Sequence, residues 1–204
     1  RPATRFPRRR QANVETPISM IRRLCILSAA VLLASCGVGE RSYYMLTADG
    51  PAPSGGGSGI GVGPVSLAEY IDRPNLVIAE GENQLGIAEN HRWAGDLSAS
   101  ITRVTAANLG RRLKTGNVRS YPWRGDEGIG HQVTIDVRQL HGAADGYAVI
   151  EAGWRVYSLP DRKLKATRTF VDREPLEKDG YQPLVAAESK LLSRLADDIA
   201  AALR

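Results

Sequence analysis

A short apolar run that ends at a cysteine divides this chain into two parts. Met20–Arg23 places two arginines directly before the apolar run 24–34, and Cys36 follows two residues later. Two basic residues, about a dozen apolar residues and small residues before a break are typical of a secretory signal peptide. The run is too short for a membrane-spanning helix, which needs about 20 residues. We therefore expect residues 20–35 to be a signal segment and residues 36–204 to carry the fold.

The end of that segment, Leu33-Ala34-Ser35-Cys36, resembles the bacterial lipobox. In such signals the cysteine thiol receives a diacylglyceryl group, and a peptidase then cuts before it. The sequence thus predicts lipidation at Cys36 and a lipid-anchored protein that faces the periplasm. Gly37 stands where many enteric-type lipoproteins retained in the inner membrane have Asp, which favours the outer membrane. The alternatives are an ordinary signal peptide and a buried helix with an incidental cysteine.

Residues 1–19 contain proline and arginine without apolar periodicity. A signal peptide has its basic residues near its start, so we expect translation to begin at Met20. Residues 1–19 would then be an unstructured stretch that results from a start site assigned too far upstream. A transit peptide is the alternative, because the stretch is rich in arginine and poor in acids.

Charge and cysteine content limit the partners and the chemistry of the mature chain. Residues 1–35 hold seven arginines and one glutamate, and removing these leaves 20 Lys+Arg against 21 Asp+Glu in residues 36–204. A body that is nearly neutral does not predict binding to nucleic acid. Of the two cysteines, Cys25 lies in the signal segment and Cys36 carries the lipid. The mature chain then has no disulfide, and an ordinary core of about 165 residues must stabilise it.

Hydrophobic periodicity predicts an α+β fold. Apolar residues at helical spacing indicate long amphipathic helices at 92–114 and 182–203. Alternating apolar residues predict half-buried strands at 133–137, 148–156 and 164–171, joined as an antiparallel meander with a turn at Asp145-Gly146. Shorter strands are expected at 43–47, 60–65, 76–79 and 84–88. These elements predict a mixed, largely antiparallel sheet with two long amphipathic helices packed on one face.

Residues 50–59 are almost entirely glycine, proline and serine, which predicts a flexible loop. The strand before this loop is too short to form a domain, so we expect residues 36–204 to form a single domain. The glycines that follow at 59–63 lack the third glycine and the helix opening of a dinucleotide-binding fingerprint.

Catalytic chemistry is sparse. The chain has three histidines, and we expect His131, at a strand start, and His141, at a turn, to be solvated surface residues rather than ligands. Neither a zinc-protease motif nor a nucleophile elbow is present. We therefore expect a protein that is not an enzyme, with no catalytic residues, no metal and no cofactor.

Two segments combine aromatic, arginine and acidic residues at element boundaries, namely 67–77 and 89–97. Arg, Tyr and Trp are enriched at the centres of interfaces, so these segments are candidates for binding a partner. Their candidate residues are Tyr70, Asp72, Arg73, Pro74, His91 and Arg92. The structural interpretation is that Tyr70 and Trp93 belong to the core, and that Asp72, Arg73 and Arg92 form caps and internal ion pairs.

The same segments resemble the PqiC-type ABC-type transport auxiliary lipoproteins. The matching residues are Tyr43-Tyr44-x-Leu46, Val62–Val65, Leu67–Pro74, His91–Ala94, Asn108-Leu109, Tyr121–Trp123 and the closing helix near 187–203. The resemblance extends over essentially the whole mature chain and adds Tyr121 and Trp123 to the candidate partner-binding residues.

The resemblance implies a non-catalytic lipoprotein that docks or scaffolds an intermembrane lipid transport system at the outer membrane. Its partners would be a mammalian-cell-entry (MCE) domain protein and ABC transporter subunits. Two alternatives remain open: a periplasmic lipoprotein that itself binds a hydrophobic ligand, and a regulator of a cell-wall enzyme. Antiparallel edge strands and the Arg/Tyr-rich segment are also compatible with a homo-oligomer.

Overall fold

The computed structural model describes residues 40–125, 128–159 and 161–204. The predicted signal segment and the lipidation site at Cys36 lie outside these residues. The described strands are β1 (Ser42–Tyr44), β2 (Gly59–Leu67), β3 (Asn75–Gly81), β4 (Gln84–Trp93), β5 (Val118–Ser120), β6 (Ile129–Ala143), β7 (Tyr147–Ser158) and β8 (Lys163–Pro175). Two helices accompany them, α2 (Leu97–Leu113) and α3 (Tyr181–Leu203). The predicted α+β class is confirmed.

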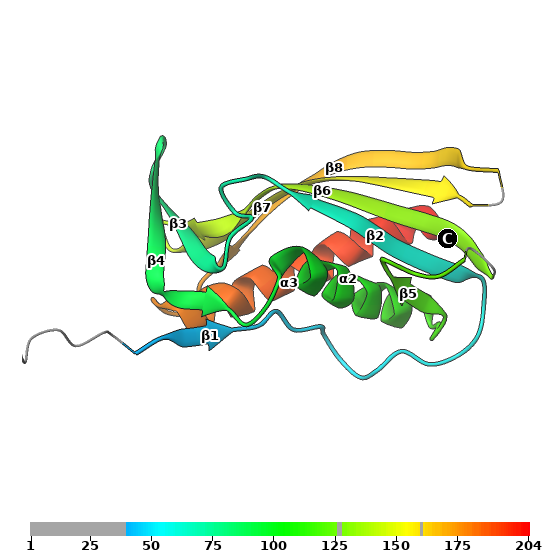
Figure 1. Cartoon of the computed structure of the whole chain (residues 1–204), viewed down its shortest axis with the longest axis horizontal. Helices are drawn as coiled ribbons and strands as arrows, with labels where there is room; N and C mark the ends of the chain where they lie inside the picture. Colours follow the sequence, from blue (N-terminus) through cyan, green and yellow to red (C-terminus); the bar gives the residue numbers. More distant parts are fainter. Residues whose placement is uncertain (1–39, 126–127, 160) are drawn as a thin grey trace, which may run out of the picture. The chain divides into compact units, whose positions relative to one another are not determined.

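The strand β6 organises the sheet (Figure 1). One edge of β6 pairs along its length with β7, which in turn pairs with β8. The other edge pairs first with β2, from Gly59↔Ile129 to Leu67↔Val137, and then with β3 at Ile78↔Gly142. β2 and β3 therefore follow one another along a single edge of β6, and the segment that joins them must leave the sheet between them.

Both directions of pairing occur in this sheet. The long pairings, β6–β7 and β7–β8, form the predicted antiparallel meander, and β3–β4 is an antiparallel hairpin. The pairings β1–β4, β2–β5, β2–β6 and β3–β6 are parallel. A parallel neighbour requires a crossover connection, and here α2 lies between β4 and β5.

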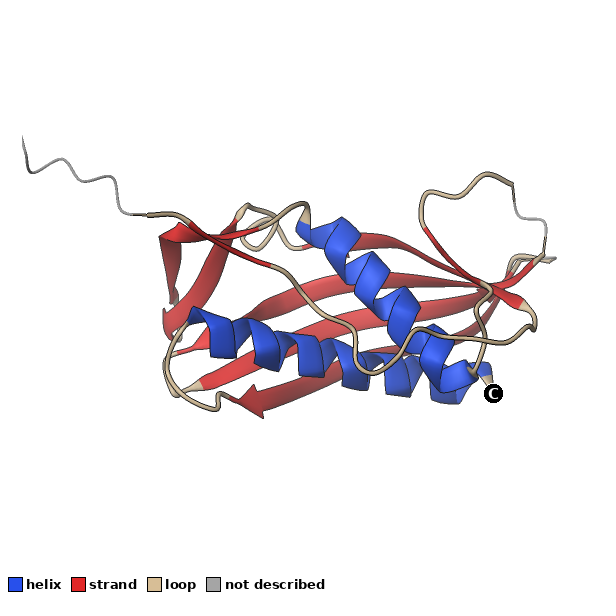
Figure 2. Ribbon diagram, turned by 90° about the horizontal axis from the view of Figure 1, so that it is seen from below, coloured by secondary structure: helices blue, strands red, loops and turns tan. Residues whose placement is uncertain are grey.

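Both helices cover the same face of the sheet, as predicted (Figure 2). The prediction that the first helix begins at residue 92 was wrong, because Arg92 and Trp93 extend β4. The carboxylate of Asp96 accepts a hydrogen bond from Ala99 N at 2.6 Å and so caps α2. The helix ends where Lys114 adopts a left-handed conformation, at the predicted end of this helix.

The core lies between the helix layer and the sheet. The apolar stripes of α2 and α3 pack against inward side chains of β2, β6 and β7, and Trp154 is the largest fully buried residue. Its indole Nε1 donates to the carboxylate of Asp198 at 2.9 Å, so the one polar atom of this ring is satisfied.

The segment between β1 and β2, which includes the Gly/Pro/Ser stretch, runs along the helix layer (Figure 2). Thr47 N donates to Ser189 Oγ at 3.1 Å, and Asp49 N donates to Asn108 Oδ1 at 3.0 Å. Farther along, the carbonyl oxygen of Gly55 accepts a hydrogen bond from Gly116 N at 2.9 Å. These bonds tie the segment to both helices.

Candidate partner-binding site

The segment that joins β2 to β3 is a tight turn that stands out from the edge of β6. Ala68 N donates to Val137 O at 2.9 Å and continues the pairing of β2. The amides of Ile71 and Asp72 then both donate to Ala68 O, and the buried Ile71 side chain fixes the turn to the core. In the candidate segment 67–77, Leu67 therefore ends β2, residues 68–74 form a turn, and Asn75 begins β3. We call residues 68–74 the edge turn.

Tyr70 contributes to the packing of the edge turn. Its hydroxyl donates to Arg138 O at 2.9 Å, and its ring meets His141 edge-on, with 5.9 Å between the ring centroids. Burial, and secondly the charge of Glu151, raise the pKa of Tyr70. Tyr70 is half-buried and Trp93 is buried, so packing accounts for both of these aromatic residues.

The charged residues of the edge turn behave differently. Asp72 and Pro74 are exposed and Arg73 is half-buried. Within the described residues, neither Asp72 nor Arg73 forms an ion pair, and the buried Nε of Arg73 has no hydrogen-bond partner. An unsatisfied buried donor is costly.

The end of β4 lies directly beside the edge turn. Trp93 N donates to Pro74 O at 2.7 Å, and Asn75 pairs with Arg92. The Nε of Arg92 donates to the backbone oxygen of Glu89 at 3.4 Å, and no carboxylate of the described chain pairs with its guanidinium. The structure therefore brings Asp72, Arg73 and Arg92 to one place, where none of them has an ion pair with another described residue.

His91 projects to the other side of β4 from Arg92, because side chains alternate along a strand. Its Nδ1 lies 2.8 Å from the hydroxyl of Tyr44, and its ring stacks on Tyr181 with centroids 3.8 Å apart. This aromatic cluster joins β1, β4 and the start of α3. The sequence did not predict the contact with Tyr181, which lies 90 residues farther along the chain.

Tyr121 and Trp123 lie apart from the edge turn. Tyr121 N donates to Val62 O at 2.8 Å, and the two aromatic rings meet edge-to-face, with 5.6 Å between their centroids. Val62 and the start of the edge turn are separated by six residues of extended strand, or about 20 Å. The eight candidate residues therefore do not form one surface, because Tyr121 and Trp123 lie apart from the edge turn and His91 faces the other side of β4.

Sequence analysis missed a charge network beside Tyr70. Arg138 Nη1 lies 2.9 Å from Glu151 Oε1, and its Nε lies 3.5 Å from Asp136 Oδ2. The hydroxyl of Ser66 also donates to Asp136, at 3.0 Å. The hydrogen bond to Glu151 is the largest cause of the raised pKa of Arg138. Strand alternation alone does not show that these residues share a row, because β6 is irregular between Val137 and Gln139.

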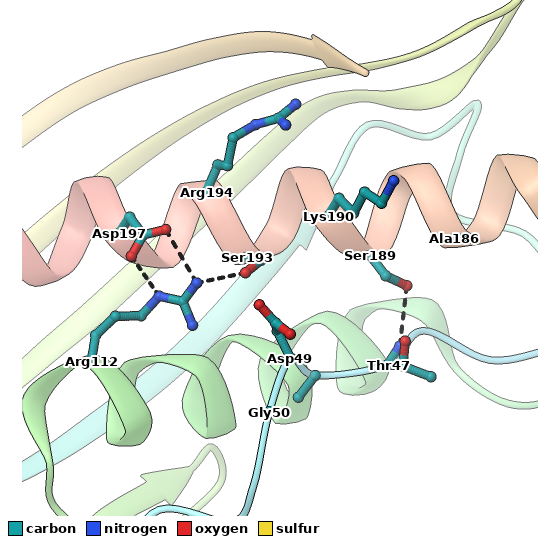
Figure 3. Close-up of a pocket in the computed structure, with 11 residues that line it drawn as sticks. Thr47, Asp49, Gly50, Arg112, Ala186, Ser189, Lys190, Ser193, Arg194 and Asp197 are labelled. Carbon is teal, nitrogen blue, oxygen red and sulfur yellow. Dashed lines mark hydrogen bonds and ion pairs between the residues drawn. The ribbon is translucent and has the colours of Figure 1, made fainter. Parts of the chain in front are cut away.

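A groove with a volume of about 620 Å³ lies elsewhere, between the β1–β2 segment and the two helices (Figure 3). Its basic side chains are held by acids of the same chain. Arg112 Nε lies 2.6 Å from Asp197 Oδ1, and Lys190 Nζ lies 3.1 Å from Glu174 Oε1. Arg194 reaches both Asp172 and Glu174, at 2.5 and 2.7 Å. The first pair joins α2 to α3 and the others join α3 to β8, so the basic side chains of the groove are neutralised within the chain.

His141 corrects one prediction. It is buried within β6, with Nδ1 2.8 Å from Gly142 O, and is not a solvated turn residue. The reason is that β6 continues to Ala143, where it pairs with β3, and is therefore longer than the alternating run 133–137 indicated.

In the described part of the chain, no three His, Cys, Asp or Glu side chains are grouped as metal ligands. No helix among these residues is long and apolar enough to cross a membrane.

The fold and this surface define a two-layer α+β domain with a turn that displays unpaired charge. The family described as ABC-type transport auxiliary lipoprotein component matches residues 44–200 of this chain, and the chain belongs to that family. No curated protein matches the chain significantly.

Two solved structures have a similar fold. One, described as an uncharacterized protein, is 25% identical with a TM-score of 0.68, and the match covers 81% of this chain and 99% of the other. The second is protein XCC0632 from Xanthomonas campestris, which is 18% identical with a TM-score of 0.61. That match covers 78% of this chain and 92% of the other. The second similarity concerns the fold alone.

Proposed function

We propose that this protein is a non-catalytic, lipid-anchored subunit that docks or scaffolds an MCE-type intermembrane lipid transporter at the outer membrane. The family match over residues 44–200 carries the proposal, because it defines an auxiliary component of an ABC-type transport system. The lipobox at Cys36 supplies the anchor, and Gly37 favours the outer membrane. The MCE-domain protein and the ABC subunits are the proposed partners.

The edge turn, together with Arg92, is the proposed docking surface. Asp72, Arg73 and Arg92 lie together and have no internal ion pair among the described residues, whereas the basic residues of the groove are paired. A partner that offers carboxylates and backbone carbonyls to Arg73 and Arg92 would fit this surface. Arginines that are desolvated on binding often dominate the energy of an interface.

The first experiment is to isolate the tagged, full-length lipoprotein from its native membranes and to identify the co-purifying proteins by mass spectrometry. Recovery of an MCE-domain protein or of ABC transporter subunits supports the proposal. Recovery of cell-wall enzymes alone, or of lipid alone, contradicts it.

The substitution Arg73→Glu tests the docking surface. We expect it to reduce recovery of the partner about tenfold or more, because a buried, hydrogen-bonded charge at an interface contributes on the order of 2 kcal/mol or more. The melting temperature should stay close to that of the wild type, since Arg73 forms no ion pair within the described part of the chain.

The matched control is Arg155→Glu, which reverses the same charge at an exposed position of β7. Equal recovery of the partner with Arg73→Glu and Arg155→Glu would exclude the edge turn as the docking surface. A large drop in the melting temperature of Arg73→Glu would show that Arg73 is structural instead.

A further inference from the structure

Two large apolar side chains, one in β1 and one directly after it, are exposed to solvent. Tyr44 and Leu46 point into the protein, where Tyr44 binds His91 and Leu46 is fully buried. By alternation Tyr43 and Met45 point outward, and their exposed fractions are 62% and 61%. Packing within this chain therefore does not explain why these two positions are apolar.

A shallow depression lies beside Met45, with a volume of about 280 Å³. Its lining includes the small residues Ala94, Gly95 and Ala99, the polar residues Asp96 and Ser100, and Arg103 of α2, which adds a guanidinium group. The carboxylate of Asp96 is engaged by Ala99 N as the cap of α2. We call Tyr43, Met45, Ala94, Gly95, Ala99 and Arg103 the β1 patch. It combines an amphipathic ring, an apolar side chain and a cation on one surface.

Chain length limits how far the β1 patch lies from the proposed lipid anchor. Cys36 and Tyr43 are seven residues apart, so the chain between them spans at most about 25 Å even when it is fully extended. α3, with 23 residues, is about 35 Å long. If Cys36 is lipidated, the β1 patch belongs to the part of the protein that the anchor holds near the membrane.

The chemistry of the β1 patch fits a lipid headgroup layer. Tyrosine is enriched at the boundary between headgroups and acyl chains, because its ring is apolar and its hydroxyl is polar. Arg103 can donate two hydrogen bonds to a lipid phosphate. Addition of a strand from a protein partner is a poorer fit, because β1 offers only three paired residues.

We propose that the β1 patch rests on the headgroup layer of the membrane that carries the anchor. This inference rests on the lipidation of Cys36 in the proposed function, but not on the transporter partner. The membrane contact would then fix the orientation of the domain, in addition to holding it at the surface.

The test uses the lipidated full chain in vesicles of phosphatidylethanolamine and phosphatidylglycerol. Cys25 and Cys36 are the only native cysteines, and neither leaves a free thiol in the mature lipoprotein, so Met45→Cys introduces a single labelling site. The fluorescence of a label at residue 45 is measured in two kinds of vesicle. One contains lipids whose acyl chains carry bromine close to the glycerol, and the other contains the same lipids without bromine. Acrylamide measures the exposure of the same label to water.

The matched control is Leu164→Cys, which also replaces an exposed apolar residue. Leu164 pairs with Tyr157, which pairs with Gln132 of β6. Residue 45 directly follows β1, and β1 is connected through β4 and β3 to Gly142 of β6. Ten residues of strand, or about 33 Å, separate these two places along β6. The two labels therefore report on opposite ends of the sheet.

We expect brominated lipid to quench the label at residue 45 and acrylamide to quench the label at residue 164. Equal quenching by acrylamide at both positions would overturn the inference. Protection of residue 45 from both quenchers would also overturn it, by showing that protein covers the patch. Failure of the labelled proteins to float with the vesicles would contradict the anchor itself, and transporter recovery is measured independently of all three results.

Discussion

At the scale of single residues, Glu188 is the least expected feature. It lies on the buried face of α3, and its Oε2 has no hydrogen-bond partner among the described residues. Burial raises its pKa from 4.5 to about 8, so the folded protein holds this carboxyl group in its neutral form at neutral pH. The protonated, neutral side chain of Glu188 can be buried in the core, whereas burial of its ionised carboxylate would cost a large free energy of desolvation.

The titration of Glu188 predicts how stability depends on pH. The folded-state pKa lies above the unfolded value, so this residue causes the free energy of unfolding to fall as pH rises from about 4.5 to about 8. The slope approaches about 1.4 kcal/mol per pH unit within that window. Glu188→Gln should remove this contribution and stabilise the protein relative to wild type more at pH 9 than at pH 5. Urea unfolding at several pH values measures it.

Glu174 provides the control with the opposite sign. The hydrogen bond from Arg194 is the largest cause of the lowered pKa of Glu174, so the ionised carboxylate stabilises the folded protein. This stability is lost as the pH falls through the lowered pKa of Glu174. Glu174→Gln should therefore cost stability at neutral pH and little in acid. An unchanged pH dependence in Glu188→Gln would contradict the assignment of the slope to Glu188.

At the scale of elements, the sequence predicted periodic segments well and their limits less well. Both helices and the β6–β7–β8 meander follow from apolar spacing. The start of α2 was misplaced because Trp93, an apolar residue in phase with the helix, instead ends β4. The spacing could not show the parallel pairing of β1 with β4, because alternation reveals which face a residue occupies but not which strand lies beside it.

The same reasoning explains what was missed at the site. Composition identified the segments around Asp72, Arg73 and Arg92. The pairing of Asn75 with Arg92 and the hydrogen bond from Trp93 N to Pro74 O show that these segments adjoin, which the sequence alone could not. The separate location of Trp123 depends on β2, whose Gly61 makes room for the indole ring.

Gly61 gives a prediction for β2. A Cβ atom at this position would lie 2.6 Å from Cη2 of Trp123, which is closer than real contacts allow. Gly61→Ala should displace the indole ring and destabilise the protein by about 1–3 kcal/mol, as overpacking does in other cores. Thermal unfolding and the tryptophan emission spectrum measure both effects.

Gly81→Ala is the matched control, because nothing lies within 4 Å of a Cβ atom at that position. Its melting temperature should remain near that of the wild type. Equal stability of Gly61→Ala and Gly81→Ala would show that Trp123 yields without cost.

At the scale of the whole molecule, the proposed lipid anchor at Cys36 would determine where the protein acts. Cys36→Ser removes the thiol that the lipobox chemistry modifies. We expect the variant to lose its membrane association, since two or more acyl chains are what make such anchoring stable. Membrane fractionation followed by mass spectrometry of the N-terminal peptide measures the result. Full retention of a processed Cys36→Ser protein in the membrane would contradict the anchor.

The shared edge of β6 has a consequence for how such a domain can vary. β2 and β3 are each held by their own hydrogen bonds to β6, so the register of neither strand depends on the length of the connection between them. Loop closure becomes only slowly less favourable as a loop lengthens. The edge turn is therefore a natural graft point: exchanging residues 68–74 between relatives should transfer partner preference while leaving the rest of the scaffold intact.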